Sequence, residues 1–199
     1  MPDAFLFDIG NVIITFDFRI SAKKLAEDSA VPADEILPLV SPLATELELG
    51  RLSPEQFIAG ASARIGYTGT PERFQAVFAD IFALNDPMAA FVAELKAAGT
   101  PLYLLSNTNA IHACFFEANF PVFGLFDGGI YSHEVGLMKP DPAIYERARS
   151  DLRLVPERTV YIDDNAANCV AGGEAGFLSI PYDAKRHGEF LDAVAALHR

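Results

Sequence analysis

The sequence predicts an α/β protein, in which a parallel sheet is covered by helices on both faces and a small helical segment is inserted after the first strand. Three observations predict this class. Short apolar runs recur along the chain and end in polar residues, as buried parallel strands do. Segments of roughly 10 to 15 residues with helical features separate most of these runs. Residues 19–85 break the alternation, because they contain several helix starts and no convincing strand.

Five segments are expected to form the strands of one sheet. The three clearest are continuously apolar, which is typical of strands that are buried on both faces. The expected strands are Ala4–Phe7, Pro101–Leu105 and Thr159–Ile162, with weaker candidates at Gly129–Tyr131 and Phe177–Ile180. Ligands of such sheets bind at the carboxyl ends of the strands, so the residues that follow each run are the candidates for function.

Capping residues mark the helix boundaries. Asp86–Pro87 is expected to supply an N-cap and a first helical residue, with Gly99 just after the end of that helix. Asp141–Pro142 predicts a second helix start of the same kind. Among residues 19–85, Ser53–Gln56 has the pattern of a capping box, and Thr70–Arg73 precedes an apolar helical segment. A helical insert at this place would lie over the carboxyl edge of the sheet and act as a lid.

The composition excludes several classes of protein. The 199 residues are 51% hydrophobic and include 16 phenylalanines, which excludes a disordered chain. The 27 acidic and 15 basic residues give a formal net charge of −12. A nucleic acid or an anionic membrane is therefore not an expected partner, because both attract positively charged proteins. The sequence shows no secretory leader and no apolar run of the ~20 residues that cross a membrane.

The cysteines and histidines show no spacing that is typical of a metal site or a catalytic triad. Two cysteines cannot form a disulfide framework, which favours a reducing, cytoplasmic setting. Cys114 lies in an apolar stretch and is expected in the core. The histidines are expected as surface or packing residues, namely His112, His133, His187 and His198.

Acidic residues follow two of the expected strands. Asp8 comes directly after the first run, and Asp163 and Asp164 come directly after the run at Thr159–Ile162. A parallel sheet gathers these positions at one edge, where three carboxylates repel one another unless a cation lies between them. Oxygen ligands without histidine or cysteine favour a hard cation such as Mg²⁺.

Hydrogen-bond donors follow the remaining strong run. Ser106 and Asn107 come after Pro101–Leu105, and Lys139 precedes the helix that begins near Asp141. Together with a metal ion, the ammonium group and the hydroxyl would form a positive, hydrogen-bond-donating pocket. A phosphoryl group fits such a pocket.

Four motifs, in order along nearly the whole chain, resemble those of the haloacid dehalogenase-like (HAD-like) hydrolases, namely Phe7–Val12, Leu105–Thr108, Lys139–Asp141 and Ile162–Asn165. The sequence is most similar to the branch that contains α-D-glucose-1-phosphate phosphatase and the N-terminal phosphatase domain of soluble epoxide hydrolase. The resemblance implies a Rossmann-like core with a helical cap. It places the first strand and flap in residues 1–17, the cap in residues 18–86 and the rest of the core in residues 87–199.

The resemblance also implies a magnesium-dependent phosphatase acting on a small phosphorylated metabolite. Asp8 would attack phosphorus and form an aspartyl-phosphate, which water then hydrolyses. Mg²⁺ would be held by the carboxylate of Asp8, the backbone carbonyl of Gly10 and Asp164. We expect a sugar phosphate, such as an anomeric hexose phosphate, as the substrate.

The other site residues implied by the resemblance bind the phosphoryl group. Ser106 and the backbone of Asn107 would contact its oxygens. Lys139 would neutralise the nucleophile and the phosphate, and Asp163 would orient that ammonium group. Which of Asp163 and Asp164 binds the metal directly stays open.

The sequence departs from the family pattern at one position. Phosphatases of this family usually carry a second aspartate two residues after the nucleophile, which acts as general acid and base, and here that residue is Gly10. A site without this acid should favour leaving groups that need little protonation, such as an anomeric hydroxyl or an acyl oxygen. Asp17 is a possible substitute for the missing acid.

Two other functions are weighed against the phosphatase. A metal-independent haloacid dehalogenase would use an equivalent aspartate, but the pair Asp163–Asp164 would repel a haloacid carboxylate. The presence of Gly10 is the one feature that favours a catalytically weak binding or regulatory member. Against it weighs the joint presence of Asp8, Ser106, Lys139 and Asp164. The sequence leaves the physiological substrate and the oligomeric state open.

Overall fold

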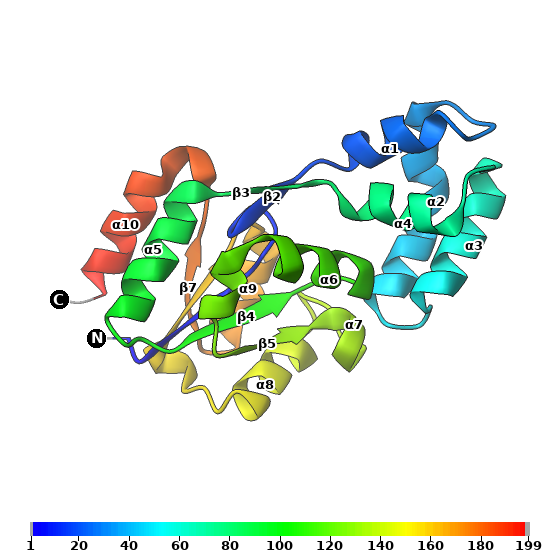
Figure 1. The fold of residues 1–199 in the computed structure, drawn as a ribbon. Helices are drawn as coiled ribbons and strands as arrows, with labels where there is room; N and C mark the ends of the chain where they lie inside the picture. The colour runs from blue at the N-terminus through cyan, green and yellow to red at the C-terminus, as the bar shows by residue number, and fades with distance from the viewer. Residues whose placement is uncertain (1, 198–199) are drawn as a thin grey trace.

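The computed structural model describes residues 2–197, which form a five-stranded parallel sheet with helices around it and a separate group of helices (Figure 1). The strand order is β5-β4-β1-β6-β7, and every neighbouring pair is parallel. The strands are β1 (Ala4–Phe7), β4 (Leu102–Ser106), β5 (Gly128–Tyr131), β6 (Thr159–Asp163) and β7 (Leu178–Pro181). The predicted α/β fold and all five of its expected strands are confirmed.

The register of the central strands places acidic residues from distant parts of the sequence at the same edge of the sheet. All four residues of β1 are buried, as the continuous apolar run predicts. Phe7 pairs with Ile162 of β6, so the next residue of each strand, Asp8 and Asp163, leaves the sheet at the same edge. Phe7 also pairs with Leu104 of β4, which ends at Ser106. The carboxyl edge of the sheet is therefore where the candidate residues meet.

Helices cover both faces of the sheet, and alternate residues of β1 contact the two layers. Phe5 and Phe7 pack in a cluster with residues of α5, α6 and α10, whereas Leu6 packs with residues of α8 and α9. These helices are α5 (Asp86–Ala97), α6 (Ala110–Asn119), α7 (Ser132–Val135), α8 (Pro142–Asp151), α9 (Ala166–Glu174) and α10 (His187–Ala196). Short 3₁₀ segments occur at Pro121–Leu125, Pro156–Arg158 and Ala184–Arg186.

Four further helices, which we call the helical insert, lie beyond the carboxyl edge of β4 and β5 (Figure 1). They have an apolar cluster of their own, built around Phe57, Phe74 and Phe78. The helices are α1 (Phe18–Ala26), α2 (Ala33–Glu48), α3 (Pro54–Ile65) and α4 (Pro71–Ala79). The capping box at Ser53 and the cap at Thr70 are present as predicted. The division of the chain at residues 18 and 86 stays a prediction.

Two strands that the sequence did not predict join the insert to the sheet domain. β2 (Ile14–Phe16) and β3 (Phe82–Leu84) form an antiparallel pair. The expectation of no strand between residues 19 and 85 is therefore wrong for β3. Three residues are too few to show a strand period, and the two partners are far apart in the sequence. The chain enters the helical insert through β2 and returns to the sheet domain through β3.

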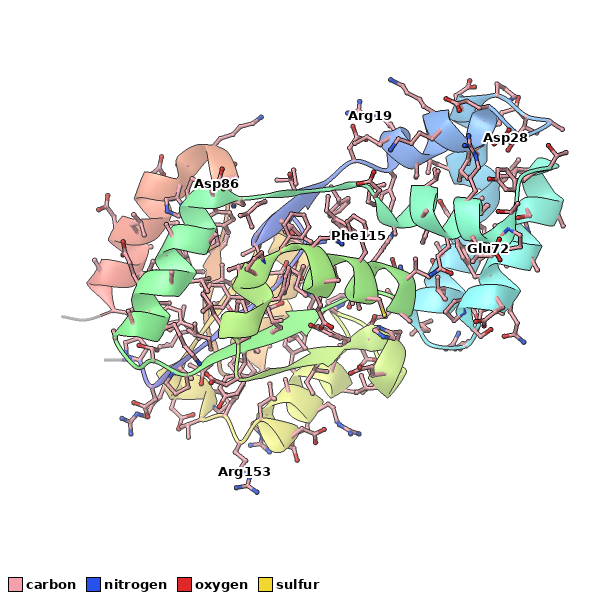
Figure 2. All side chains as sticks on the ribbon, viewed as in Figure 1. Arg19, Asp28, Glu72, Asp86, Phe115 and Arg153 are labelled. Atoms are coloured by element: carbon pink, nitrogen blue, oxygen red, sulfur yellow. The ribbon has the colours of Figure 1, made fainter. Side chains whose placement is uncertain are left out.

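Two local predictions are wrong. Asn85, not Asp86, occupies the N-cap position of α5, although its side chain makes no capping hydrogen bond. The buried amide of Asn85 instead donates to the carbonyl of Val12 and to the hydroxyl of Tyr182. Asp86 is exposed as the first helical residue (Figure 2). Cys114 is exposed, because its position on α6 faces away from the core. In contrast, the N-cap at Asp141 is confirmed.

The histidine that packs most deeply is His112, which is buried and agrees with its expected packing role. His198 lies outside the described residues. Within residues 2–197, no helix combines the length and the apolar character needed to span a membrane.

Candidate active site

Three carboxylates from two neighbouring strands meet at the carboxyl edge of the sheet. Asp8 directly follows β1, Asp163 is the last residue of β6, and Asp164 follows it. Each offers an oxygen that lies within 4.8 Å of the others. Asp8 and Asp163 are buried, whereas Asp164 is exposed. The structure thus brings together the acids that the sequence singled out.

Lys139 is the cation of this cluster. Its side chain is 2% exposed, and its Nζ lies 2.7 Å from Asp8 Oδ1 and 2.7 Å from Asp163 Oδ2. Nζ also donates to the backbone carbonyl of Leu105 at 2.9 Å. Burial by itself would lower the pKa of Lys139, but the two carboxylates outweigh it and raise this pKa above its ordinary value. The group is therefore a fixed ammonium ion at neutral pH.

Asp163 is fully occupied by protein donors. Besides Lys139, its oxygens accept hydrogen bonds from the hydroxyl of Tyr161 at 2.5 Å, the amide of Asn168 at 3.0 Å and the backbone N–H of Asn165 at 2.8 Å. With four donors, this carboxylate has little capacity left for a metal ion. The arrangement suits an orienting role, and Asp164 is the better placed acid for a cation.

Sequence reasoning missed Tyr161 and Asn168. Tyr161 lies two residues before Asp163 on the same strand, so the two side chains lie on the same face of the sheet. The alternation of side chains along a strand would have been enough to predict this contact from the sequence. Asn168 lies one helical turn into α9. Its contact with Asp163 depends on how that helix packs.

Asp164 keeps an open side. Asn11 donates a hydrogen bond from Nδ2 to Asp164 Oδ2 at 2.9 Å, and the carboxylate is otherwise exposed. Asn11 adopts a left-handed backbone conformation with φ of 54°, which asparagine tolerates better than most residues. The loop after β1 therefore contributes both Asp8 and a positioning contact for Asp164.

The charges of the cluster fit a divalent cation. Asp8, Asp163 and Asp164 with Lys139 leave two negative charges unbalanced. Burial is the main reason why the pKa of Asp8 is raised to about 6. The positive charge of Lys139 lowers this pKa, and the negative charge of Asp163 raises it further. A hard cation between Asp8 and Asp164 would relieve this repulsion, and all-oxygen ligands are those that Mg²⁺ prefers.

The loop after β4 faces the same edge with its backbone held in place. The side-chain amide of Asn107 contacts the backbone of Lys139 twice, donating to its carbonyl at 2.9 Å and accepting from its N–H at 2.8 Å. The hydroxyl of Ser132 bridges the N–H and the carbonyl of Thr108, each at 2.9 Å. Because the Asn107 side chain is occupied, only its backbone is available to a ligand. Ser106 is buried at the end of β4.

The position of the missing general acid is filled by an aromatic ring. A Cβ added at Gly10 would lie 2.8 Å from Cε1 of Phe16, which is closer than real Cβ contacts. Asp17 does not replace the acid, because it is the N-cap of α1 and its carboxylate is paired with Arg19 at 2.8 Å. Hydrogen bonds from Arg19 lower the pKa of Asp17 to about 2, so it carries no proton at neutral pH.

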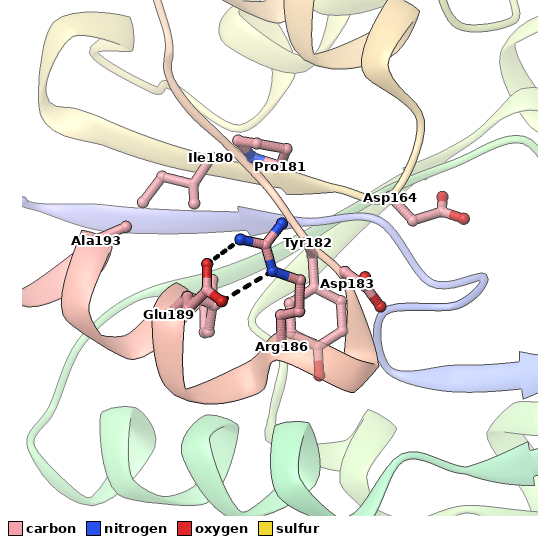
Figure 3. A pocket seen from close by; sticks show the side chains of 9 residues that line it. Asp164, Ile180, Pro181, Tyr182, Asp183, Arg186, Glu189 and Ala193 are labelled. Carbon is pink, nitrogen blue, oxygen red and sulfur yellow. Dashed lines mark hydrogen bonds and ion pairs between the residues drawn. The ribbon is translucent and has the colours of Figure 1, made fainter.

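A cavity of about 450 Å³ lies on the C-terminal side of Asp164 (Figure 3). Figure 3 shows that Arg186, in its wall, is held by Glu189 of the same helical region. Asp8, Ser106 and Lys139 do not line this cavity. The charge cluster, and not this cavity, is therefore the candidate for chemistry.

Known proteins share the sequence pattern and the fold. The family model of a haloacid dehalogenase-like hydrolase matches residues 2–176. D-ribitol-5-phosphate phosphatase of Bacteroides thetaiotaomicron is 28% identical over 181 residues, covering 86% of this chain and 87% of that protein.

Solved structures agree with this match. The structure of a HAD family enzyme from Bacteroides thetaiotaomicron has a TM-score of 0.85 at 23% identity, covering 96% of this chain and 98% of that chain. The wild-type form of that enzyme in complex with magnesium and inorganic phosphate has a TM-score of 0.82 at 24% identity, covering 92% and 96%. The match over residues 2–176 shows that the chain belongs to the haloacid dehalogenase-like hydrolase family.

Proposed function

We propose that the protein is a magnesium-dependent phosphatase that hydrolyses a small phosphorylated metabolite. The observation that carries this proposal is the buried ion pair of Lys139 with Asp8 and Asp163, beside the exposed Asp164. The similarity to D-ribitol-5-phosphate phosphatase and to a HAD family enzyme bound to magnesium and phosphate supports it. A cytoplasmic location is part of the proposal.

In the first chemical step, a carboxylate oxygen of Asp8 attacks phosphorus. A bond forms between this oxygen and phosphorus, and the bond from phosphorus to the leaving oxygen breaks, with its electron pair going to that oxygen. In the second step, water attacks the aspartyl-phosphate, which releases phosphate and a proton and restores the carboxylate. Lys139 neutralises charge in both steps, while Asp163 holds its ammonium group in place.

Binding of the phosphoryl group falls to the loop after β4. The hydroxyl of Ser106 and the backbone N–H of Asn107 would donate to the phosphoryl oxygens. Asp8, Asp164 and the backbone carbonyl of Gly10 would hold Mg²⁺, which supplies positive charge to the transferring group when bound. The helical insert would close over this edge as a lid.

The decisive experiment measures phosphate release from a panel of sugar phosphates with wild type and Asp8→Asn. We expect turnover that stops on addition of EDTA and resumes with Mg²⁺, and a loss of more than about 10³-fold in the variant. Asp80→Asn is the control, because Asp80 pairs with Lys24 on the surface of the insert. Phosphate release that survives EDTA, or equal rates in Asp8→Asn, would contradict the proposal. Metal-independent halide release would support the dehalogenase alternative instead.

We further propose that the substrate is a sugar phosphate with a good leaving group, such as an anomeric hexose phosphate. Phe16 lies over Gly10, and Asp17 is bound to Arg19, so neither position offers a general acid. General acid catalysis is typically worth about 10²–10⁴ in rate. We therefore expect kcat/KM for α-D-glucose 1-phosphate to exceed that for D-glucose 6-phosphate by about 10²-fold. Asp17→Asn should leave this ratio unchanged, and a ratio near one would refute the idea.

A further inference from the structure

The helical insert contains a second cavity, of about 240 Å³. Its walls come from the start of α1, one face of α2 and the end of α4, and the lining residues are Phe18, Leu37, Val40, Ser41, Ala44, Thr45, Glu48 and Phe78. The volume is below the roughly 300–1,000 Å³ of pockets that bind drug-sized ligands. It therefore suits a smaller molecule or one part of a substrate.

Aromatic contacts place this cavity beside the proposed phosphate site. The rings of Phe18 and Phe78 lie 6.1 Å and 4.5 Å from the ring of His112, which is in the first turn of α6. That helix begins directly after the loop that follows β4. Phe18 also lies 5.1 Å from Phe16, the ring that covers Gly10. The side chains that line the cavity are therefore connected, through Phe16 and His112, to the segments that follow β1 and β4.

Glu48 is the only charged residue that lines the cavity. Its side chain is half-buried at the C-terminal end of α2, and burial raises the pKa of its carboxyl group. No hydrogen bond or opposite charge from residues 2–197 offsets this effect. Glu46, two residues earlier, is instead paired with Arg51 on the surface. Glu48 thus carries an unused acceptor next to an apolar wall.

The other polar groups of the lining are already occupied. The hydroxyl of Ser41 donates to the backbone carbonyl of Leu37 at 2.6 Å, and that of Thr45 donates to the carbonyl of Ser41 at 3.3 Å. Each hydroxyl has thus used its one proton, and its oxygen can only accept a further hydrogen bond. A ligand in this cavity therefore meets apolar surface, one carboxylate and two hydroxyl oxygens, and all of these polar groups are acceptors.

We propose that Glu48 accepts hydrogen bonds from hydroxyl groups of the substrate's leaving group, while Phe18 and Phe78 cover its carbon surface. This inference rests on the proposed phosphatase function and names the part of the substrate that the insert recognises. The negative charge favours neutral polyhydroxylated groups and disfavours a second phosphate, which it would repel. A sugar monophosphate combines the required features.

The test compares α-hexose 1-phosphates of glucose, galactose and mannose with acetyl phosphate, whose leaving group has no hydroxyl donor. Glu48→Gln keeps the size of the side chain and removes its charge, and Glu46→Gln is the matched control on the same helix. We expect Glu48→Gln to lower the ratio of kcat/KM for the preferred hexose phosphate over acetyl phosphate by tenfold or more. This is the size expected for a hydrogen bond to a charged group. Glu46→Gln should keep the wild-type ratio.

A finer version uses deoxyfluoro analogues of the preferred hexose phosphate, because fluorine cannot donate a hydrogen bond. For one analogue, kcat/KM of the wild type should be about tenfold lower than for the parent hexose phosphate. Glu48→Gln should lower kcat/KM for that analogue no further, because the substitution and the fluorine remove the two halves of the same hydrogen bond. The inference is wrong if the ratio is unchanged in Glu48→Gln, or if wild type hydrolyses acetyl phosphate but none of the hexose phosphates. If wild type hydrolyses none of these compounds, the proposed function itself fails.

Discussion

The carboxyl edge of the sheet and the helical insert differ in how their charged side chains are paired. At the edge of the sheet, Asp163 accepts hydrogen bonds from four donors, and Lys139 is paired with two carboxylates. In the helical insert, Glu48 is half-buried beside an apolar wall and has no partner among the described residues. The carboxylate of Asp163 is therefore satisfied by protein donors, whereas that of Glu48 can still accept a hydrogen bond from a bound molecule.

This difference teaches how chemistry and selectivity are divided in the fold. A reacting carboxylate must be held to a fraction of an ångström, and Asp8 is held by Lys139, whose ammonium group is itself fixed by Asp163. A recognition residue keeps an unsatisfied group, which costs some stability in the free protein. Removing a charge should therefore destabilise one region and stabilise the other.

The largest expected effect comes from Lys139→Met. This change leaves Asp8 and Asp163 buried without their cation, which typically costs about 3–5 kcal/mol of the free energy of unfolding. Urea unfolding at pH 7 in EDTA measures this cost without help from a metal ion. Lys24→Met, which removes an exposed ion pair with Asp80, is the control and should have little effect. Equal stability of the two variants would show that the buried pairs do not hold the site together.

The second prediction concerns His112, which lies where the two regions meet. Its ring stacks on Phe78, and its nitrogens lie 3.1 Å from the carbonyl of Phe78 and 3.0 Å from the amide of Asn109. Burial lowers its pKa from 6.5 to about 4, so the unfolded chain binds a proton in this interval and the folded chain does not. Stability that the neutral ring contributes is present above pH 6.5 and is lost as the pH falls toward 4.

Comparison with His112→Gln separates the contribution of His112 to the pH dependence of stability from the contributions of other titrating groups. The difference in unfolding free energy between wild type and variant should shrink by up to about 3 kcal/mol between pH 7 and pH 4. Denaturant titrations at several pH values would measure it. A difference that is independent of pH would mean that the ring titrates alike in both states.

The smallest effect is expected for Glu48→Gln, and its sign is opposite to that of Lys139→Met. Removal of a half-buried charge that has no partner among the described residues should raise the unfolding free energy at pH 7 slightly. The folded pKa of Glu48 is raised, so the penalty is present above that pKa and disappears below the ordinary value of 4.5. Thermal unfolding at pH 7 and pH 4, with Glu46→Gln as control, would measure both. A destabilised variant would indicate that Glu48 already has a partner.

Much of the fold was predictable because its signals are local. Each of the three continuous apolar runs forms a strand that is buried on both faces, and caps such as Ser53 and Asp141 start helices where expected. The short strand β3 was not predicted, because three residues are too few to show the alternating pattern of a strand. Its partner β2 is also separated from it in the sequence by the whole helical insert. Cys114 was misplaced, because an apolar neighbourhood in sequence does not say which face of a helix a residue occupies.

The sequence by itself determined which chemical groups reach the edge of the sheet, because parallel strands always end on one side. It thereby placed Asp8, Ser106 and Asp163 in one site from three distant segments. Only the tertiary structure decided the details that depend on packing between elements. It showed that Phe16 fills the space beside Gly10 and that Glu48 lines a cavity in the helical insert. Backbone direction follows from local pattern, whereas the contacts of a side chain depend on how distant segments pack.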